Sequence, residues 1–382
     1  MKEREKIVTV GIPAFKAQDH ICDLLASIQI QTMRKNISVV IANDNPGDRE
    51  DYVKLTKRFP DLDITVLPDV EKNGGPGVAR QRILEACETS WITFCDADDL
   101  LISPFSIESL VKAIEPSVIE VQGVFYQEVT DHPQGVRMLP RNDVGHPWVF
   151  GRLYFVDFLR MNDIKFSKLR AMEDGQFNWE IRMSIEGTPL KINIVDAPIY
   201  LWRVGSEHSI TRIGVKENGG IPLYNYDLCQ VGATAAAINA IHHCKKRNPF
   251  NGGITRFTVE MMIGHYFTYI ECLDRKPLFA KQNLFNAKRF YNLVYKQIEN
   301  QIDDKILKDM YTMQLASKSP DLIGIIPEIT FFDFMKLIKE QEYNGKDEFL
   351  EIRKELPQWV VDLDLKSGVL GEEGYIHTEG ES

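Results

Sequence analysis

An acidic cluster directly follows an apolar run in the first third of the chain. The apolar residues Trp91 to Cys95 open into Asp96-Ala97-Asp98-Asp99. Carboxylates this close repel one another unless a cation neutralises them, and such oxygen ligands suit Mg²⁺ or Mn²⁺ beside a phosphate. Alternation along a strand predicts that Asp96 and Asp98 point to the same side, as candidate metal ligands. The alternative is an acidic turn before a helix that begins near Ser106.

Two further sites carry charged side chains in positions suited to chemistry. Glu173 and Asp174 are adjacent acids, and a carboxylate within hydrogen-bond reach of a hydroxyl can remove its proton as a general base. The alternative is an exposed first helical turn, where the helix dipole favours acids. Arg80 follows the glycine-rich run 73–77. It either meets a phosphate or the acids, or is a solvated helix residue.

Residues 7–120 alternate between strand-like and helix-like segments, which must position these side chains. Strands are expected at 7–12, 37–42, 64–67 and 91–95, and helices at 19–30, 49–59 and 76–89. This alternation predicts an α/β fold: a Rossmann-like, mainly parallel sheet with helices on both faces. Ligands of such sheets bind outside the carboxyl ends of the strands, where the chemistry-bearing residues fall.

The rest of the chain is predicted to be mixed and then mostly helical. A strand is expected at 120–128, a mobile loop around 131–146, and helices near 155–161 and after Glu173. We place a catalytic domain at 1–215, a helical C-terminal domain at 222–370 and an acidic, disordered tail at 371–382. The glycines and proline of residues 214–222 mark the boundary.

The bulk composition is that of a globular protein. The chain has 382 residues, of which 44% are hydrophobic, enough to build a sizeable core. No apolar run approaches the roughly 20 residues needed to span a bilayer, and the N-terminus has no signal-type apolar segment, so a cytoplasmic location is expected. The six cysteines lack CxxC pairing, which favours reduced thiols over disulfides or a zinc site.

The negative charge is concentrated at the C-terminal end. Residues 301–382 carry 18 of the 55 acidic and 9 of the 45 basic side chains, which leaves 37 and 36 for residues 1–300. An acidic C-terminal part repels nucleic acids and anionic bilayers, so neither is favoured as a partner. The one basic cluster, residues 242–247, is interpreted as a helix C-terminus.

The strand-end motifs occur in a particular order. They are Gly11-Ile12-Pro13-Ala14-Phe15, Ala42-Asn43-Asp44-Asn45, Asn73 to Arg80, Asp96 to Asp99, Met172 to Phe177, and Tyr200 to Arg203 followed by Ser206 to Thr211. Over about residues 6–212, this order resembles the family-2 glycosyltransferases. Those enzymes have the GT-A fold and transfer a sugar, with inversion, from a nucleotide diphosphate.

The resemblance implies a role for each matching residue. Asp174 corresponds to the catalytic base, and Glu173 beside it to a residue that orients hydroxyls. The implied donor-binding residues are Pro13, Phe15, Asp44, Asn73, Gly75, Arg80, Asp96, Arg203 and Ser209. The implied metal ligands, for Mn²⁺ or Mg²⁺, are Asp96, Asp98 and His208. For Phe15, the implied aromatic platform for a base competes with ordinary core packing.

The chain departs from the family at two positions and leaves its acceptor open. Lys16 stands where Asn is common, and Asn43 where an acid is common. We expect a nucleotide-diphosphate-sugar donor, most simply a UDP-sugar, and a hydroxyl acceptor such as a glycan. The alternatives are a glycosyltransferase that modifies hydroxylated bases of DNA and a catalytically silent sugar-nucleotide-binding scaffold. The C-terminal domain is expected to shape the acceptor side or a homo-oligomer interface.

Overall fold

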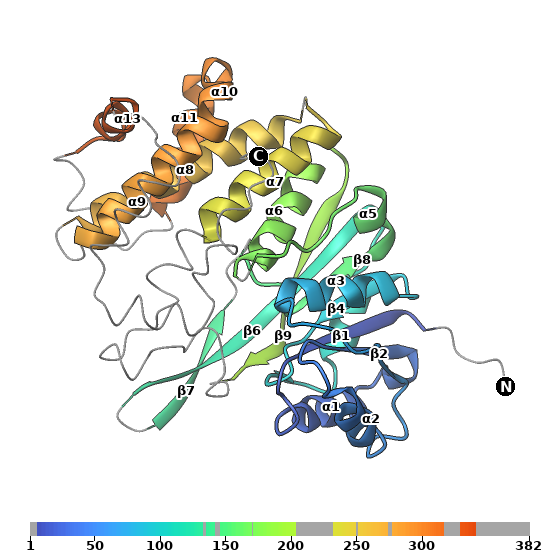
Figure 1. Ribbon diagram of the computed structural model, residues 1–382. Coiled ribbons are helices and arrows are strands. Elements are labelled where there is room, and N and C mark those ends of the chain that lie inside the picture. Colours follow the sequence, from blue (N-terminus) through green and yellow to red (C-terminus); the bar gives the residue numbers. More distant parts are fainter. Residues whose placement is uncertain are drawn as a thin grey trace. The chain divides into compact units, whose positions relative to one another are not determined.

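The computed structural model describes residues 6–132, 135–141, 146–169, 171–203, 232–249, 251–273, 277–316 and 329–340 (Figure 1). The chain divides into two compact units. The first comprises Met1–Ile181 and Thr188–Ser209, and the second Arg182–Gly187 and Ile210–Ser382. The expected domain limits at 215, 222 and 370 lie outside the described residues and stay predictions, as does the disordered tail.

The first unit is built on one mixed sheet of nine strands. Four neighbours are parallel: β3 (Ile64–Val66), β2 (Ile37–Asn43), β1 (Val8–Ala14) and β4 (Trp91–Phe94). The order then continues through β8 (Arg152–Phe155), β6 (Val118–His132), β9 (Lys191–Trp202) and β5 (Leu100–Leu101), and β7 (Gly135–Arg141) pairs with β6. The predicted α/β class is confirmed. Parallel pairing dominates only the β3-β2-β1-β4 half of the sheet.

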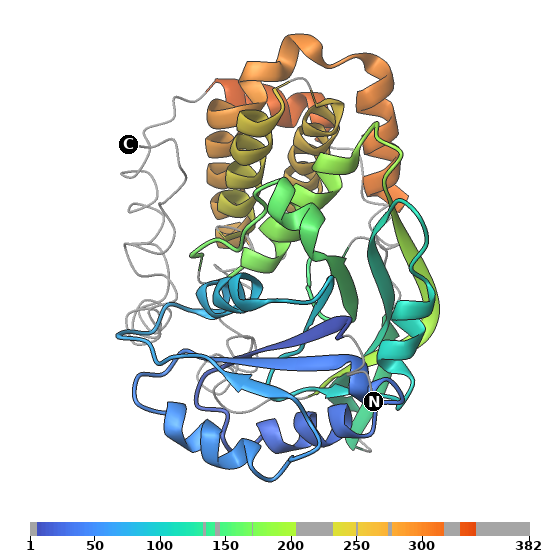
Figure 2. The ribbon, with the colours of Figure 1, turned by 90° about the vertical axis from the view of Figure 1, so that its right-hand side faces the viewer.

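Helices cover both faces of this parallel half. Helices α1 (Ile21–Gln29) and α2 (Arg49–Thr56) lie on one face, and α3 (Pro76–Ala86) lies on the other (Figure 2). The central strand β1 is therefore buried on both sides, and its Val8, Val10 and Ile12 are fully buried. A strand covered on both faces reads as a continuous apolar run, which explains why the sequence located it.

The mobile loop predicted around residues 131–146 is wrong in part. Strand β6 runs to His132, and β7 pairs with it antiparallel from Gly135 to Arg141. Most described side chains of β7 are exposed, so the strand lacks the alternation between apolar and polar residues that would have predicted it. The predicted helices nearby are confirmed as α4 (Ser106–Lys112), α5 (Val156–Met161) and α6 (Glu173–Ile185).

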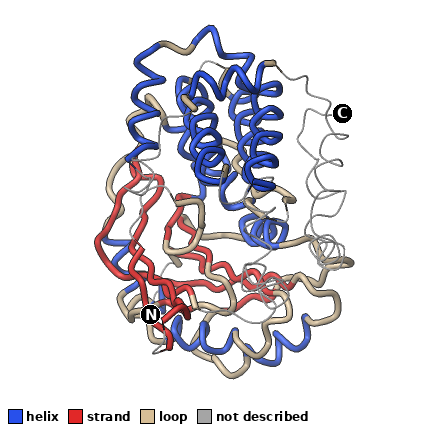
Figure 3. Tube along the Cα trace, turned by 90° about the vertical axis from the view of Figure 1, so that its left-hand side faces the viewer, coloured by secondary structure: helices blue, strands red, loops and turns tan. Residues whose placement is uncertain are grey.

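The described part of the second unit is helical, which confirms the expected character of the C-terminal half. Helices α7, α8 and α9 pack against one another side by side (Figure 3). The elements are α7 (Ala233–Arg247), α8 (Gly252–Cys272), α9 (Pro277–Phe290), a π-helix (Tyr291–Tyr295), α10 (Lys296–Ile298), α11 (Asp304–Ala316) and α13 (Phe331–Lys339). The basic cluster ends α7, as interpreted. Among the described helices, none is long and apolar enough to cross a membrane.

Candidate active site

The register of the parallel strands brings the predicted motifs to one edge. Ala14 pairs with Asn43, and Gly11 pairs with Phe94. One further backbone bond extends each ladder: Asp44 N–H donates to the Ala14 carbonyl at 2.8 Å, and Cys95 N–H donates to the Gly11 carbonyl at 2.9 Å. The segments that follow β1, β2 and β4 therefore emerge together at the carboxyl edge, as the sequence predicted.

Asp44 anchors the glycine-rich loop before α3. Its carboxylate is 3% exposed and accepts the N–H groups of Gly74 at 2.9 Å and Gly75 at 2.7 Å, and the Asn73 amide at 2.8 Å. Gly75 has φ +87°, a conformation that a side chain rarely adopts. Three predicted donor-binding residues, Asp44, Asn73 and Gly75, are thus brought together. Their bonds are to one another, and base reading by Asp44 stays a prediction.

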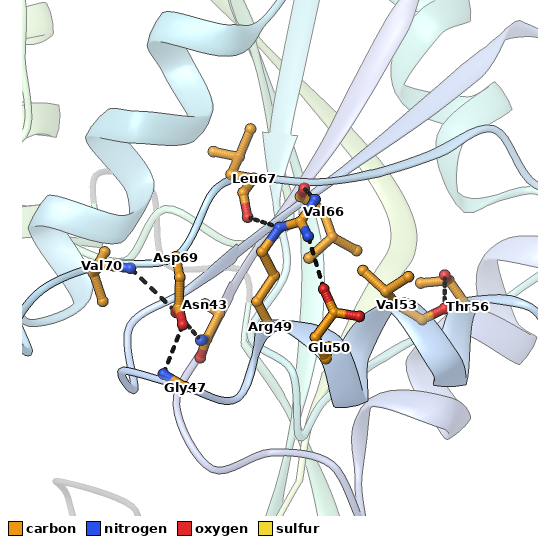
Figure 4. A network of polar contacts seen from close by, with 10 residues as sticks. All are labelled: Asn43, Gly47, Arg49, Glu50, Val53, Thr56, Val66, Leu67, Asp69 and Val70. Carbon is orange, nitrogen blue, oxygen red and sulfur yellow. Dashed lines mark hydrogen bonds and ion pairs between the residues drawn. The ribbon is translucent and has the colours of Figure 1, made fainter.

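Asn43 is explained by an acid that the sequence did not single out. Asp69 accepts the Asn43 amide at 3.0 Å, the N–H of Val70 at 3.1 Å and the N–H of Gly47 at 2.6 Å (Figure 4). A carboxylate at position 43 would be repelled by Asp69, whereas the amide donates to it. The departure from the family at Asn43 is therefore coupled to Asp69.

The acidic motif 96–99 forms a turn, so the prediction from strand alternation is wrong. Strand β4 ends at Phe94, and the N–H of Asp99 donates to the Asp96 carbonyl at 3.1 Å. Asp99 is buried and accepts the Tyr200 hydroxyl at 2.6 Å and the Arg203 N–H at 2.8 Å. Tyr200 also accepts the N–H of Asp96 at 2.9 Å. Asp99 and Tyr200 fix the turn, and the sequence did not identify Tyr200 in this role.

The partly exposed side chains of this turn are those of Asp96 and Asp98. Burial raises the pKa of Asp99 well above its usual range, and the charges of Asp96 and Asp98 raise it further. This local excess of negative charge fits a divalent cation chemically. Within the described residues, however, no group of three His, Cys, Asp or Glu side chains is placed to hold a metal. His208, the predicted third ligand, lies outside the described residues.

Arg80 joins the acidic turn to the Glu173–Asp174 pair. Its guanidinium is 5% exposed; one nitrogen donates to Asp96 at 2.7 Å and another donates to Glu173. The alternative of a solvated Arg80 is thereby wrong. Burial alone would lower the pKa of Arg80, but the charges of Asp96 and Glu173 raise it overall. Arg80 is a permanent cation between two acidic segments.

The Glu173–Asp174 pair is held in a desolvated place at the start of α6. Glu173 is 4% exposed, so the alternative of an exposed helical turn does not apply to it. Burial raises the pKa of Glu173 to about 8, with a further contribution from the charge of Asp174 and an opposing one from Arg80. Burial raises the pKa of Asp174 to about 6, and Arg80 again opposes the shift. Asp174 is therefore the first of the two to ionise as the pH rises.

Close packing between α3 and α6 sets the distance between these groups. A Cβ atom on Gly77 would lie 2.1 Å from the Ser167 carbonyl oxygen and 3.0 Å from Cγ of Glu173. Only glycine fits there, because the backbone oxygen cannot move aside as a flexible side chain can. Gly77 thus allows Arg80, one turn further along α3, to reach Glu173.

The remaining predicted residues have varied surroundings. Pro13 is half-buried, and Phe15 is 43% exposed, which excludes core packing for Phe15. The Lys16 ammonium lies 5.3 Å from the Phe15 ring centroid. Arg203 donates to the Asp98 carbonyl at 2.6 Å and to Asp23 at 3.0 Å, so it lies against the acidic turn. Ser209 lies outside the described residues.

Comparison with known proteins identifies the class to which this site belongs. The sequence profile of glycosyl transferase family 2 matches residues 9–164. A crystal structure of S. aureus TarS 1–349 in complex with UDP-GlcNAc superposes with a TM-score of 0.56 at 15% identity, covering 82% of this chain and 93% of that one. Full S. aureus TarS gives the same TM-score at 14% identity, with 87% and 55% covered. The chain belongs to the family-2 glycosyltransferases and has a GT-A-like fold.

Curated relatives carry the same family name but are matched only in part. Glycosyltransferase GlyA of Streptococcus pneumoniae is 31% identical over 107 residues, which are 28% of this chain and 15% of GlyA. The uncharacterized glycosyltransferase EpsJ of Bacillus subtilis is 24% identical over 235 residues, which are 55% of this chain and 64% of EpsJ. The chain thus spans less than two thirds of the length of each.

Proposed function

We propose that this chain is an inverting glycosyltransferase that moves a sugar from a nucleotide-diphosphate donor, most simply a UDP-sugar, to a hydroxyl acceptor. The observation that carries the proposal is the buried Arg80 bridge between Asp96, on the strand edge, and Glu173, beside Asp174. One cation thereby holds a donor-side acid and a candidate base in a single arrangement. Membership of the family supports the reaction class.

The donor end of the proposed site is the edge formed by Phe15, Asp44 and the acidic turn. The exposed ring of Phe15 provides a surface for a nucleobase, and the anchored loop 73–75 shapes the neighbouring wall. Asp96 and Asp98 would hold Mn²⁺ or Mg²⁺, which when bound neutralises the charge that develops on the leaving diphosphate. Arg203 lies against the same turn and closes its outer side.

Asp174 is the proposed base. Its pKa of about 6 leaves it ionised at neutral pH yet basic enough to accept the proton of an acceptor hydroxyl. Glu173 is fixed by Arg80 and is therefore suited to orient a hydroxyl group. Inversion follows if the acceptor oxygen attacks the sugar carbon from the face opposite the diphosphate, with Asp174 on the acceptor side.

The two alternative functions are less well supported. A silent scaffold does not need a buried acid pair with raised pKa values, because such a pair opposes folding whenever both members are charged. A DNA acceptor would need free cations. The basic cluster 242–247 ends α7, and its Lys245 ammonium donates to Gln297 at 2.8 Å. The cytoplasmic location and the homo-oligomer remain predictions.

Slow donor hydrolysis tests this function without knowledge of the acceptor. UDP-, GDP-, CMP- and dTDP-sugars would be incubated with the chain and Mn²⁺ or Mg²⁺, and the released nucleotide measured. We expect hydrolysis of one nucleotide class, its loss in Asp98→Ala and in EDTA, and no change in Asp61→Ala, an exposed acid before β3. Full turnover in EDTA would remove the metal from the proposal, and no hydrolysis of any donor would overturn the function.

A further inference from the structure

Six aromatic side chains of the first unit form one connected group, which we call the aromatic layer. The rings of Phe150 and Tyr200 stack at 4.7 Å and 7°, and those of Trp148 and Phe150 lie at 6.0 Å and 13°. Trp148 also contacts Trp202, with ring centroids 5.4 Å apart. The members are Phe125, His146, Trp148, Phe150, Tyr200 and Trp202.

One side of the aromatic layer is tied to the acidic turn. The Tyr200 hydroxyl donates to Asp99 at 2.6 Å and accepts the N–H of Asp96 at 2.9 Å. Trp202 precedes Arg203, whose N–H donates to Asp99 at 2.8 Å. The layer therefore begins where the proposed donor end stops.

The other side of the layer is tied to the helix that carries the proposed base. The Asn178 amide, one turn after Asp174 on α6, donates to the Pro147 carbonyl at 2.6 Å and to the Trp148 carbonyl at 3.1 Å. A Cβ atom on Gly175, the residue after Asp174, would lie 3.5 Å from Cβ of Pro147. The segment 146–148 thus packs directly beside Asp174.

The members of the layer differ in exposure and carry no charge. Phe125, Phe150 and Tyr200 are buried, whereas Trp148 and Trp202 are only half-buried. Burial, followed by the charge of Arg152, lowers the pKa of His146 to about 2, so this ring is neutral. The layer offers two partly accessible indole rings on a rigid aromatic support, with carboxylates at both ends.

This combination suits a sugar ring. A pyranose has an apolar C–H face, which packs on an aromatic ring, and a rim of hydroxyls, which bond to carboxylates. Resting on the proposed function, we propose that Trp148 and Trp202 form the platform for the acceptor and that the acceptor is a carbohydrate. A sugar ring on this platform presents a hydroxyl to Asp174 while its other hydroxyls reach Glu173.

The surrounding cations argue against a phosphate-rich acceptor such as a nucleic acid. Such an acceptor needs basic side chains that can contact its backbone. The guanidinium of Arg80 donates to Asp96 and Glu173, and that of Arg203 to the Asp98 carbonyl and Asp23. Arg152 donates to Glu120 and to the His146 carbonyl. Each arginine bordering the layer is already bonded within the protein.

The test separates acceptor binding from donor chemistry. Transfer from the donor that the wild-type chain hydrolyses would be measured to a panel of methyl hexosides, methyl N-acetylhexosaminides and their disaccharides. We expect Trp148→Leu to raise the KM of the best saccharide roughly tenfold, the equivalent of about 1.4 kcal/mol of lost ring contact, while donor KM and hydrolysis stay unchanged. Trp148→Phe should lose less, and Phe105→Leu, an exposed aromatic outside the layer, should lose nothing.

A binding measurement makes the outcome independent of turnover. Saccharide titration in the presence of UDP should change the tryptophan fluorescence of the wild-type chain, and both Trp148→Leu and Trp202→Leu should weaken that response. An unchanged saccharide KM in Trp148→Leu, or no saccharide-dependent change in the wild-type chain, would overturn the platform. Donor hydrolysis with transfer to hydroxylated DNA but to no saccharide would overturn the carbohydrate acceptor and leave the proposed function intact. Absence of hydrolysis together with a Trp148-dependent saccharide response would overturn the proposed function and support the platform.

Discussion

Asp44 and Asp174 are the same residue type in one unit, yet their surroundings differ sharply. Asp44 follows a strand and accepts three hydrogen bonds from the loop 73–75. Asp174 begins a helix, where burial raises its pKa to about 6 and the charge of Asp96 adds to the shift. A carboxylate whose charge is compensated by donors holds structure together, whereas one whose charge is opposed is ready to take up a proton.

The largest expected effect tests the proton-accepting half of this comparison. Asp174→Asn should lower the rate of sugar transfer by about two to four orders of magnitude, because a positioned base contributes that much. Donor affinity, measured by calorimetry with the nucleotide diphosphate, should stay close to that of the wild-type chain. Asp157→Asn, which changes an exposed acid on α5, serves as the control. A collapse of donor affinity in Asp174→Asn would mean that this acid binds the donor.

The structural half of the comparison is tested at Asp44. Asp44→Asn should lower the free energy of unfolding by about 1–3 kcal/mol, because the amide would direct its own N–H groups at backbone donors of the glycine-rich loop. Urea unfolding measures this loss, with the exposed Asp61→Asn as the matched control. An unchanged midpoint in Asp44→Asn would show that the loop does not depend on this carboxylate.

The pH dependence of activity sharpens the comparison further. The pKa of Asp174 is raised from 3.8 to about 6, so transfer should fall about tenfold per pH unit as the pH drops below about 6. Stability should change in the opposite sense. The folded chain binds this proton more tightly than the unfolded chain, so the unfolding free energy should decrease as the pH rises from about 4 to about 6. A transfer rate that stays flat down to pH 5 would contradict the assignment.

The smallest expected effect concerns Lys16, at the edge shared with Asp44. Its φ of +49° is unfavourable for lysine and tolerated by asparagine, the residue common in the family at this place. Lys16→Asn should therefore raise the unfolding free energy by up to about 1 kcal/mol. Urea unfolding measures the gain against Lys35→Asn, an exposed change without a positive φ. A destabilised Lys16→Asn would show that the ammonium on the Phe15 ring outweighs the strain.

The sequence predicted the parts of the molecule that depend on local pattern. The apolar run of β1 and the glycine-rich start of α3 carry their own signals, and the order of the strands fixed the shared edge. Phe15, Arg80 and Asp96 accordingly lie at or beside that edge. What the pattern could not give was the partner of each side chain.

The missed features all rest on contacts between distant residues or on the absence of a local signal. Tyr200 bonds to Asp96 and Asp99 across about a hundred residues, and no spacing rule links such positions. Asp69 gains its role only through Asn43. Strand β7 exposes most of its described side chains and so shows no periodicity. Raised pKa values at Glu173 and Asp174 likewise follow from burial, which only the fold decides.

Tyr200 has a consequence for redesign and for divergence within the family. Its ring is stacked under Phe150, and its hydroxyl holds the acidic turn. Selection for a new acceptor that reshaped this ring would disturb the acids on which leaving-group departure depends. Trp148 and Trp202 are not bound by that constraint, since neither indole holds the turn. Acceptor preference can therefore drift through the two tryptophans while Tyr200 stays fixed.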